Sequence, residues 1–299
     1  MKKIILGVTA AVFLLFSGKF SAFGAENADY EYSIIGGEAV ITGFKGEPTE
    51  FDIPEFIGCY PVTEVRDNAF CNCSSLKRIG LPDTVTKLGH HCFYACYSLE
   101  SIALPEGLTE IGEGCFCGCT ELVSVEITDT LEELPDSCFR ACTSLKEIHL
   151  PSELQAVGAF CFAGCTALES AETGEKLLSI GDRAFFMCDK LNTIYIPPAC
   201  TSIGVQAVGF TCEGNMELRR SDMLIRGCAG SVAEKYARDN GFDFFETEDT
   251  EDVFAVGSAD EKNGDVPRFA LLLGASAFVL LILLLLRIVF TDWSDQKLK

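Results

Sequence analysis

The residues between Val62 and Val208 repeat one pattern every 23 positions. Phenylalanine recurs at this step at Phe70, Phe93, Phe116, Phe139, Phe162 and Phe185. A cysteine follows three residues after each of them, at Cys73, Cys96, Cys119, Cys142, Cys165 and Cys188. A fixed period of this length is typical of a solenoid, in which each unit buries its apolar positions against neighbouring units. The sequence therefore predicts one elongated repeat body rather than two ordinary domains.

Each repeat unit also contains a short segment that predicts a β-strand. Its pattern is Leu-x-x-Ile-x-Leu, as in residues 76–81, and proline follows it at Pro82, Pro105, Pro151 and Pro197. Proline has no N–H to donate, so it ends a strand. The stretch around each phenylalanine is then expected to turn the chain back, with the ring filling the interior of the coil. The unit at 168–174 is irregular, because Ala171 replaces a large aliphatic residue, and we expect the sheet to pack least well there.

Both ends of the repeat body carry patterns of closing segments. Residues 30–44 roughly alternate on both sides of Gly36-Gly37, which predicts a β-hairpin with a tight turn. Ser231 with Glu234 forms a capping box, and Gly241 suits a left-handed stop, so a helix of about eight residues is predicted between them. We expect the hairpin, within 25–61, and the helix, within 223–245, to cover the two ends of the solenoid.

These residues resemble the BspA-type leucine-rich repeat, whose pattern joins Ala-Phe-x-x-Cys to Leu-x-x-Ile-x-Leu-Pro. The resemblance covers about residues 31–245 and includes the opening and closing motifs. It implies an α/β leucine-rich-repeat solenoid with short parallel strands, with repeats over 62–222 and a degenerate last repeat. Proteins of this type are secreted or surface-exposed, and those with a known role act as adhesins. The chain departs from the pattern where cysteine replaces alanine, at Cys92, Cys115, Cys138 and Cys161.

The two ends of the whole chain predict export and membrane anchoring. Residues 1–24 begin with two lysines, continue as an apolar run and end in small residues, as an export signal does. The alternative is that this run stays uncleaved as an anchor. Residues 246–267 form an acidic linker, 268–290 a transmembrane helix and 291–299 a cytoplasmic tail. The sequence therefore predicts a single-pass protein of the cell membrane with extracellular repeats.

The chain contains 16 cysteines, and most stand in two repeat columns. The column before phenylalanine holds cysteine in some units and Ala69, Ala184 or Ala207 in others, so the position requires a small apolar side chain. We expect packed thiols. Scattered disulfides remain an alternative, since small exported proteins use them. A zinc site is another, because His90, His91, Cys92 and Cys96 are ligand types for zinc. We predict that the protein binds neither a metal ion nor a cofactor.

Charge and motif content restrict the function. The formal net charge is −21, and nucleic-acid binding depends on Lys and Arg, so a nucleic-acid partner is not expected. Three histidines leave few general bases, and the sequence has no phosphate loop, nucleophile elbow or zinc-protease motif. We therefore predict a protein that is not an enzyme.

The strand positions that flank the central aliphatic residue point outward and form a candidate binding face. In the later units these positions hold the residues that we predict to contact a ligand on a concave sheet: Glu126, Glu147, His149, Glu172 and Tyr195. Such a face favours recognition or adhesion, with an extracellular protein or glycan as the partner. Two alternatives remain: the acids only keep the sheet soluble, and the protein is a structural spacer of the cell envelope without a ligand.

Overall fold

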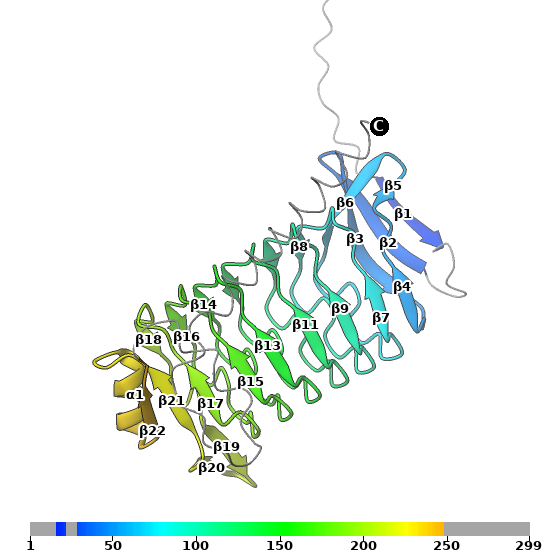
Figure 1. The fold of residues 1–299 in the computed structure, drawn as a ribbon. Coiled ribbons are helices and arrows are strands. Elements are labelled where there is room, and N and C mark those ends of the chain that lie inside the picture. The colour runs from blue at the N-terminus through cyan, green and yellow to red at the C-terminus, as the bar shows by residue number, and fades with distance from the viewer. Residues whose placement is uncertain (1–15, 22–28, 248–299) are drawn as a thin grey trace, which may run out of the picture. The chain divides into compact units, whose positions relative to one another are not determined.

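The computed structural model describes residues 16–21 and 29–247, and this part of the chain forms a stack of 23-residue coils (Figure 1). Most of the predicted export signal lies outside the described residues. So do the acidic linker beyond residue 247, the predicted transmembrane helix at 268–290 and the tail. Within the described ranges, no helix has the length and apolar character needed to cross a membrane.

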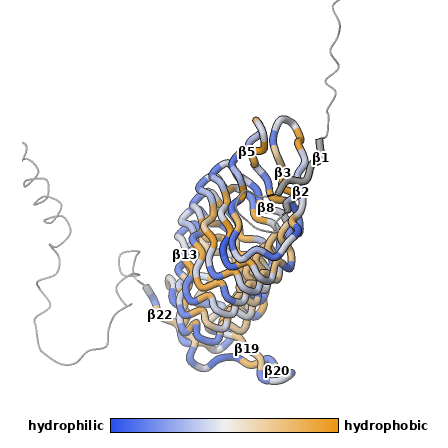
Figure 2. Tube along the Cα trace, turned by 90° about the vertical axis from the view of Figure 1, so that its right-hand side faces the viewer, coloured by the Kyte–Doolittle hydropathy of each residue, from blue (hydrophilic) through white to orange (hydrophobic). Residues whose placement is uncertain are grey.

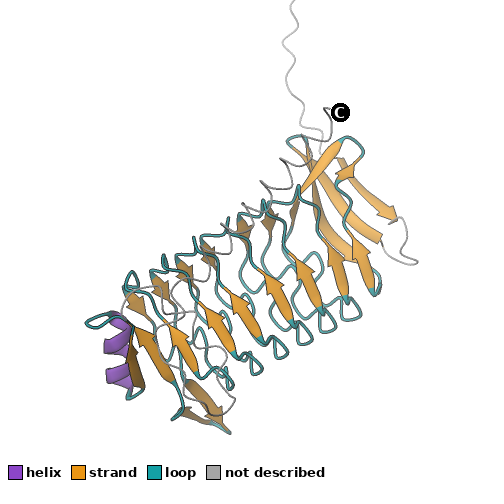
Figure 3. Ribbon diagram, viewed as in Figure 1, coloured by secondary structure: helices purple, strands orange, loops and turns teal. Residues whose placement is uncertain are grey.

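The predicted strands line one side of the stack, called here the long-strand face. Figure 3 shows these strands following one another along the face. Each has three residues with a buried central side chain, and the two flanking side chains are exposed or half-buried except in the last strand, where Tyr195 is buried. They are β7 (Arg78–Gly80), β9 (Ser101–Ala103), β11 (Ser124–Glu126), β13 (Glu147–His149), β15 (Ser170–Glu172) and β17 (Thr193–Tyr195). Pairing is parallel from β7 to β11 and between β13 and β15. The predicted solenoid with short parallel strands is therefore confirmed. The irregular strand β15 pairs with β13 but not with β17.

A second parallel sheet, the short-strand face, was not predicted. Each of its strands has two residues, the first outward or half-buried and the second inward. They are β8 (Lys87–Leu88), β10 (Glu110–Ile111), β12 (Glu133–Leu134), β14 (Ala156–Val157), β16 (Ser179–Ile180) and β18 (Ser202–Ile203). Two residues are too few to show the alternation of apolar and polar side chains that predicts a strand, so the sequence pattern does not reveal these strands.

The third side, the turn wall, contains the six repeated phenylalanines, which lie in turns rather than strands. Its coils are joined by backbone bonds such as Phe93 N–H to the Cys115 carbonyl, at 2.8 Å. Residues with positive φ recur at the repeat step, as at Asn68 and His91, and allow the chain to turn sharply. Phe160 occupies this position at φ 56°, and the guanidinium groups of Arg140 and Arg183 lie 5.6 and 5.9 Å from its ring centre.

The core is a continuous stack of phenylalanine rings. From Phe70 to Phe185, neighbouring ring centroids lie 5.1–5.5 Å apart with interplanar angles of at most 17°. All six rings are at most 1% exposed. Offset stacking of this kind adds to the free energy gained by burying the rings. Figure 2 shows the apolar positions recurring from coil to coil along the stack.

Buried cysteines fill the space beside the rings. The thiol of Cys119 donates to the carbonyl of Phe93, at 3.3 Å, and Cys96, Cys142, Cys165 and Cys188 make the same bond to the phenylalanine 26 residues earlier. The four cysteines that replace alanine are fully buried. All 16 cysteines fall in the described region and are free thiols. Their positions agree with packing as small apolar side chains.

The N-terminal segment contains the predicted hairpin. Its strands are β2 (Asp29–Ile35) and β3 (Glu38–Lys45), joined at Gly36 and Gly37. Rather than lying across the stack, β3 pairs in parallel with β6 (Tyr60–Val65) and extends the short-strand face, while Phe44 stacks on Phe70 at 4.9 Å. The remaining strands here are β1 (Phe16–Ser21), inside the predicted export signal, β4 (Glu50–Asp52) and β5 (Phe56–Ile57).

The C-terminal segment replaces the degenerate repeat with a hairpin and a helix. The hairpin consists of β19 (Phe210–Glu213) and β20 (Met216–Arg219). Strand β21 (Leu224–Gly227) then pairs with β17 and with β22 (Asp243–Glu246). Helix α1 (Val232–Asn240) begins after Ser231, whose hydroxyl accepts from the Glu234 N–H, and ends at Gly241 with φ 69°. The predicted stop at Gly241 and the Ser231 half of the capping box are confirmed, whereas the Glu234 carboxylate accepts the Gly230 N–H rather than that of Ser231.

Replacing Phe116 with alanine should destabilise the solenoid by about 3–5 kcal/mol, because it removes a buried ring from the middle of the stack. Urea unfolding followed by circular dichroism measures the change. Phe245 is 55% exposed and provides the matched control, for which Phe245→Ala should stay within about 0.5 kcal/mol. Equal losses for the two variants would contradict a stability role specific to the stack.

Thiol reagents should modify the exposed Cys59 of the native chain well before the ten buried cysteines. Burial, with a smaller effect of Cys71, raises the pKa of Cys73 to about 11. At pH 8 only about one such thiol in a thousand is therefore ionised, and its reaction should accelerate as the pH rises toward 11. Counting reacted thiols by mass spectrometry tests this. Fewer than 16 reactive thiols after unfolding without reductant would contradict free cysteines.

Candidate binding surfaces

Four of the five predicted site residues are exposed on the long-strand face. Glu126 extends from β11, Glu147 and His149 from β13, and Glu172 from β15. Because β13 and β15 pair in register, His149 lies opposite Glu172, and its Nδ1 is 2.9 Å from Glu172 Oε2. The structure therefore brings these two side chains together as a solvent-exposed hydrogen-bonded pair on adjacent coils.

Tyr195, the fifth predicted site residue, is buried rather than outward, at 7% exposure. The physical reason is the strand that follows it in space: β21 pairs with β17 and places Arg226 beside Tyr195. Its hydroxyl donates to Glu175 at 3.4 Å. Burial, with Glu175 as the next cause, raises the pKa of Tyr195 to about 12. Tyr195 is thus a packed residue of this sheet and not an exposed anchor.

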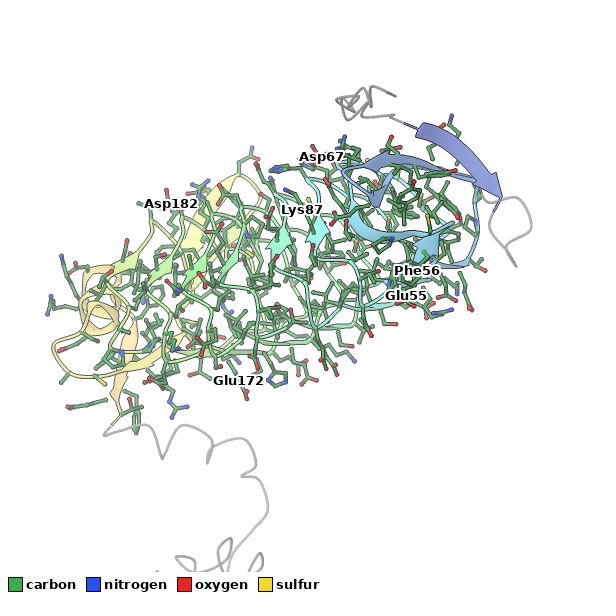
Figure 4. The ribbon with its side chains drawn as sticks, turned by 90° about the horizontal axis from the view of Figure 1, so that it is seen from above. Glu55, Phe56, Asp67, Lys87, Glu172 and Asp182 are labelled. Atoms are coloured by element: carbon green, nitrogen blue, oxygen red, sulfur yellow. The ribbon has the colours of Figure 1, made fainter. Side chains whose placement is uncertain are left out.

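A hollow lies on the short-strand face, away from the predicted site residues. It is a groove of about 720 Å³ that crosses β8, β10, β12 and β14. A smaller hollow of about 520 Å³ adjoins it at Glu133 and Ala156. Figure 4 shows Asp67 and Lys87 of this face on the side of the stack opposite Glu172. The groove and the predicted site are therefore separate surfaces.

Glycines set the floor of the groove. At Gly89 and Gly112, an added Cβ would lie 2.3 Å from the backbone nitrogen of the preceding coil, so only glycine allows the coils to approach this closely. The same position holds Gly158, Gly181 and Gly204, whereas Pro135 occupies it in one coil. Next to it, Asp67 and Asp136 accept backbone N–H groups of the following coil at 2.8 and 2.6 Å.

The groove is acidic. Its two cations are already paired, since Lys87 lies 2.7 Å from Glu110 and Arg66 lies 3.6 Å from Glu64. The hydrogen bond that the Lys87 ammonium donates to Glu110 raises the pKa of Lys87. The remaining carboxylates at the groove are those of Asp67, Glu113, Glu133 and Asp136. The signal for these residues was in the sequence: Lys87, Glu110 and Glu133 follow the 23-residue step beside the columns of buried aliphatics.

The zinc alternative has no geometric support in the described residues, where no group of three or more His, Cys, Asp or Glu side chains is placed to hold a metal ion. His90 Nδ1 accepts the Glu113 N–H at 3.1 Å, and the His91 ring packs edge-on against Tyr94. Cys92 and Cys96 are fully buried in the core. His90 and His91 thus contact a backbone N–H and a tyrosine ring, whereas Cys92 and Cys96 pack in the core, so the four side chains do not converge on one point.

Comparison with known proteins identifies the repeat. The family described as BspA type leucine rich repeat region matches residues 49–139 and 118–217, with six copies. These matches span more than half of the 299-residue chain. None of the curated proteins compared with this sequence matches it.

Crystal structures of three bacterial proteins have a similar fold. A leucine rich cell surface protein from Faecalibacterium prausnitzii aligns over 72% of this chain and 65% of its own, at 24% identity and a TM-score of 0.56. The T. pallidum leucine rich repeat protein aligns over 72% and 95%, at 25% identity and a TM-score of 0.54. A leucine-rich repeat protein from Eubacterium ventriosum aligns over 60% and 47%, at 26% identity and a TM-score of 0.53.

The chain thus spans less than two thirds of the Faecalibacterium and Eubacterium proteins. With all three it shares the overall fold, at TM-scores of 0.53–0.56. The family match covers the coils from β4 to the hairpin that ends the repeats. This chain therefore belongs to the BspA-type leucine-rich-repeat family.

Proposed function

We propose that this chain is a single-pass cell-surface protein that recognises an extracellular protein or glycan without covalent chemistry. The predicted export signal, the predicted transmembrane helix at 268–290 and the similarity to a protein described as a leucine rich cell surface protein support the location. In this proposal the repeats are extracellular, and the acidic segment 246–267 holds them away from the membrane.

One observation carries the recognition function: the stack presents outward side chains that packing does not require, on two faces of a fixed scaffold. Outward positions differ from coil to coil, whereas inward positions repeat phenylalanine, leucine and cysteine. Solenoids use such faces as extended binding surfaces. A groove of about 720 Å³ on one face gives a partner a place where side chains can be enclosed.

On the long-strand face we propose direct contact through Glu126, Glu147, His149 and Glu172. These side chains are solvent-exposed, and the pair between His149 and Glu172 fixes the orientation of both. Tyr195 has a supporting role in this proposal, because its ring is buried beneath the same face and its hydroxyl is bonded to Glu175.

The two end segments are proposed to be caps. Phe44 of the first hairpin covers Phe70, which would otherwise present an open ring at the end of the stack. At the other end, the hydroxyl of Tyr236 on α1 bonds both the N–H and the carbonyl of Val208, at 3.0 and 2.8 Å. Covering the terminal coils keeps their apolar surface out of water and blocks end-to-end association.

A structural spacer without a ligand is the second candidate, and the unbroken stack of rings favours it. A stack that continues from Phe70 to Phe185 makes a stiff rod whose length is set by the number of coils. A spacer requires this stiffness but no particular outward side chain. Mutating the outward side chains should therefore abolish function if the protein recognises a partner, but not if it is a spacer.

Cells that display the full-length chain should bind particular members of an array of extracellular proteins and glycans. Replacing Glu126, Glu147, His149 and Glu172 together with serine should reduce binding of a partner of the long-strand face by roughly tenfold or more, because it removes the contacting charges. Adherent cells on each array position are counted. A matched variant carries serine at Glu100, Glu121, Lys146 and Glu169, exposed charges beside that face.

Equal loss in the two variants would attribute binding to general charge rather than to the face. If the displayed chain bound no position of the array above cells without it, the spacer would be the better description.

A further inference from the structure

Parallel pairing of the short-strand face is interrupted once, between β10 and β12. One sheet ends at β10, and a separate sheet runs from β12 to β18. At the other coil boundaries, the residue that follows the two-residue strand donates a backbone hydrogen bond to the preceding coil. Gly112 N–H donates to the Leu88 carbonyl, and Gly158 N–H donates to the Leu134 carbonyl, each at 2.8 Å. The interruption therefore lies at one specific coil boundary.

Pro135 explains the interruption. It stands where the other coils have glycine, and it has no N–H to donate to the Ile111 carbonyl. Its ring also carries the Cβ that this position excludes elsewhere, since at Gly112 and Gly158 an added Cβ would come within 2.3–2.5 Å of backbone nitrogen. On the short-strand face, Pro135 consequently prevents the close approach that glycine allows in the other coils, whereas the turn walls of the same two coils stay joined, with Phe116 N–H donating to the Cys138 carbonyl at 2.8 Å.

The interruption leaves acceptors without donors. Among the residues that the structure describes, no backbone N–H of the next coil bonds the carbonyls of Thr109 and Ile111, whereas Thr86 accepts from Thr109 at 2.9 Å. Backbone carbonyls without a protein partner are expected to bond water or a ligand. Both carbonyls belong to coil segments whose residues line the two adjoining hollows.

Carboxylates surround these carbonyls. Glu113 and Glu133 are exposed and line the groove, and in the described part of the chain neither side chain has a hydrogen bond or an ion pair. Lys87 and Arg66 are occupied by Glu110 and Glu64. The groove thus offers acceptors and negative charge but no free cation, which is complementary to a ligand made of donors and positive charge.

From this complementarity we infer that the groove opened at Pro135 binds an extended, lysine- or arginine-rich peptide segment of a partner protein. The ammonium or guanidinium groups pair with Glu113 and Glu133, and peptide N–H groups bond the carbonyls left open at the interruption. This inference rests on the proposed recognition function and names the class of partner for one of its two faces.

The test uses the full-length chain in detergent and a short fluorescent peptide that alternates lysine with serine. Binding is followed by fluorescence anisotropy at low and at physiological salt. Glu113→Gln with Glu133→Gln should weaken binding roughly tenfold. Glu121→Gln with Glu169→Gln removes the same charge beside the opposite face, at exposed residues that belong to neither proposed binding surface, and should weaken it less than about twofold.

Pro135→Gly provides a variant that changes no charge. It restores the residue found in the other coils, so the new amide at position 135 should bond the Ile111 carbonyl and become protected from hydrogen exchange. Peptide binding should then fall several-fold. Unchanged binding with a protected amide overturns the inference, and so does equal weakening by the two glutamate pairs or stronger binding of a glutamate-serine peptide.

Failure of this inference is distinguishable from failure of the proposed function. If the lysine peptide does not bind but displayed cells still adhere to array positions through the long-strand face, only the groove assignment falls. If neither experiment detects a partner, the recognition function falls with it.

Discussion

Equivalent positions in successive coils of this solenoid stack at about the strand spacing of 4.8 Å. Each side chain must therefore pack against the side chain at the same position of the neighbouring coil. Phenylalanine satisfies this by ring stacking, at centroid distances near 5.4 Å from Phe70 to Phe139. Cysteine satisfies it with a small side chain whose thiol reaches a carbonyl of the previous coil. Glycine satisfies it by having no Cβ where backbone passes beneath. The same residue types recur every 23 positions because each coil makes the same contacts with its neighbour.

The same rule governs the outward charges. Like charges stacked on one another repel, and at several outward positions an acid instead lies beside a cation of the neighbouring coil. Lys77 pairs with Glu100, Lys87 with Glu110 and Lys176 with Glu153, each across 23 residues. These pairs are solvent-exposed, and each contributes little to stability. In the column of Lys87 and Glu110 the next residue is Glu133, which has no cation partner among the described residues, so negative charge is left unbalanced at the groove beside Pro135.

The features that could be predicted from sequence are those that depend only on the neighbouring coil. The phenylalanine and cysteine columns, the strands of the long-strand face and the helix signals at Ser231 and Gly241 are of this kind. The short-strand face was missed because a two-residue strand has no alternation to detect. Tyr195 was misplaced because its burial depends on β21, which pairs with β17 after an intervening hairpin. The groove depends on one residue, Pro135, whose effect appears only when the glycine contacts are known.

The hairpin formed by β19 and β20 shows what the architecture tolerates. It stands in place of part of a regular coil, yet it stays bonded to the coil before it. Met187 N–H donates to the Phe210 carbonyl at 2.8 Å, and the Arg220 guanidinium donates to the carbonyls of Cys188 and Leu191. An insertion here diverts the chain outward without changing the register of the coils before or after it. In evolution, such a site lets a lineage add or exchange a surface loop in one genetic event, while the number of coils, and with it the length of the rod, varies independently by duplication or loss of a 23-residue unit.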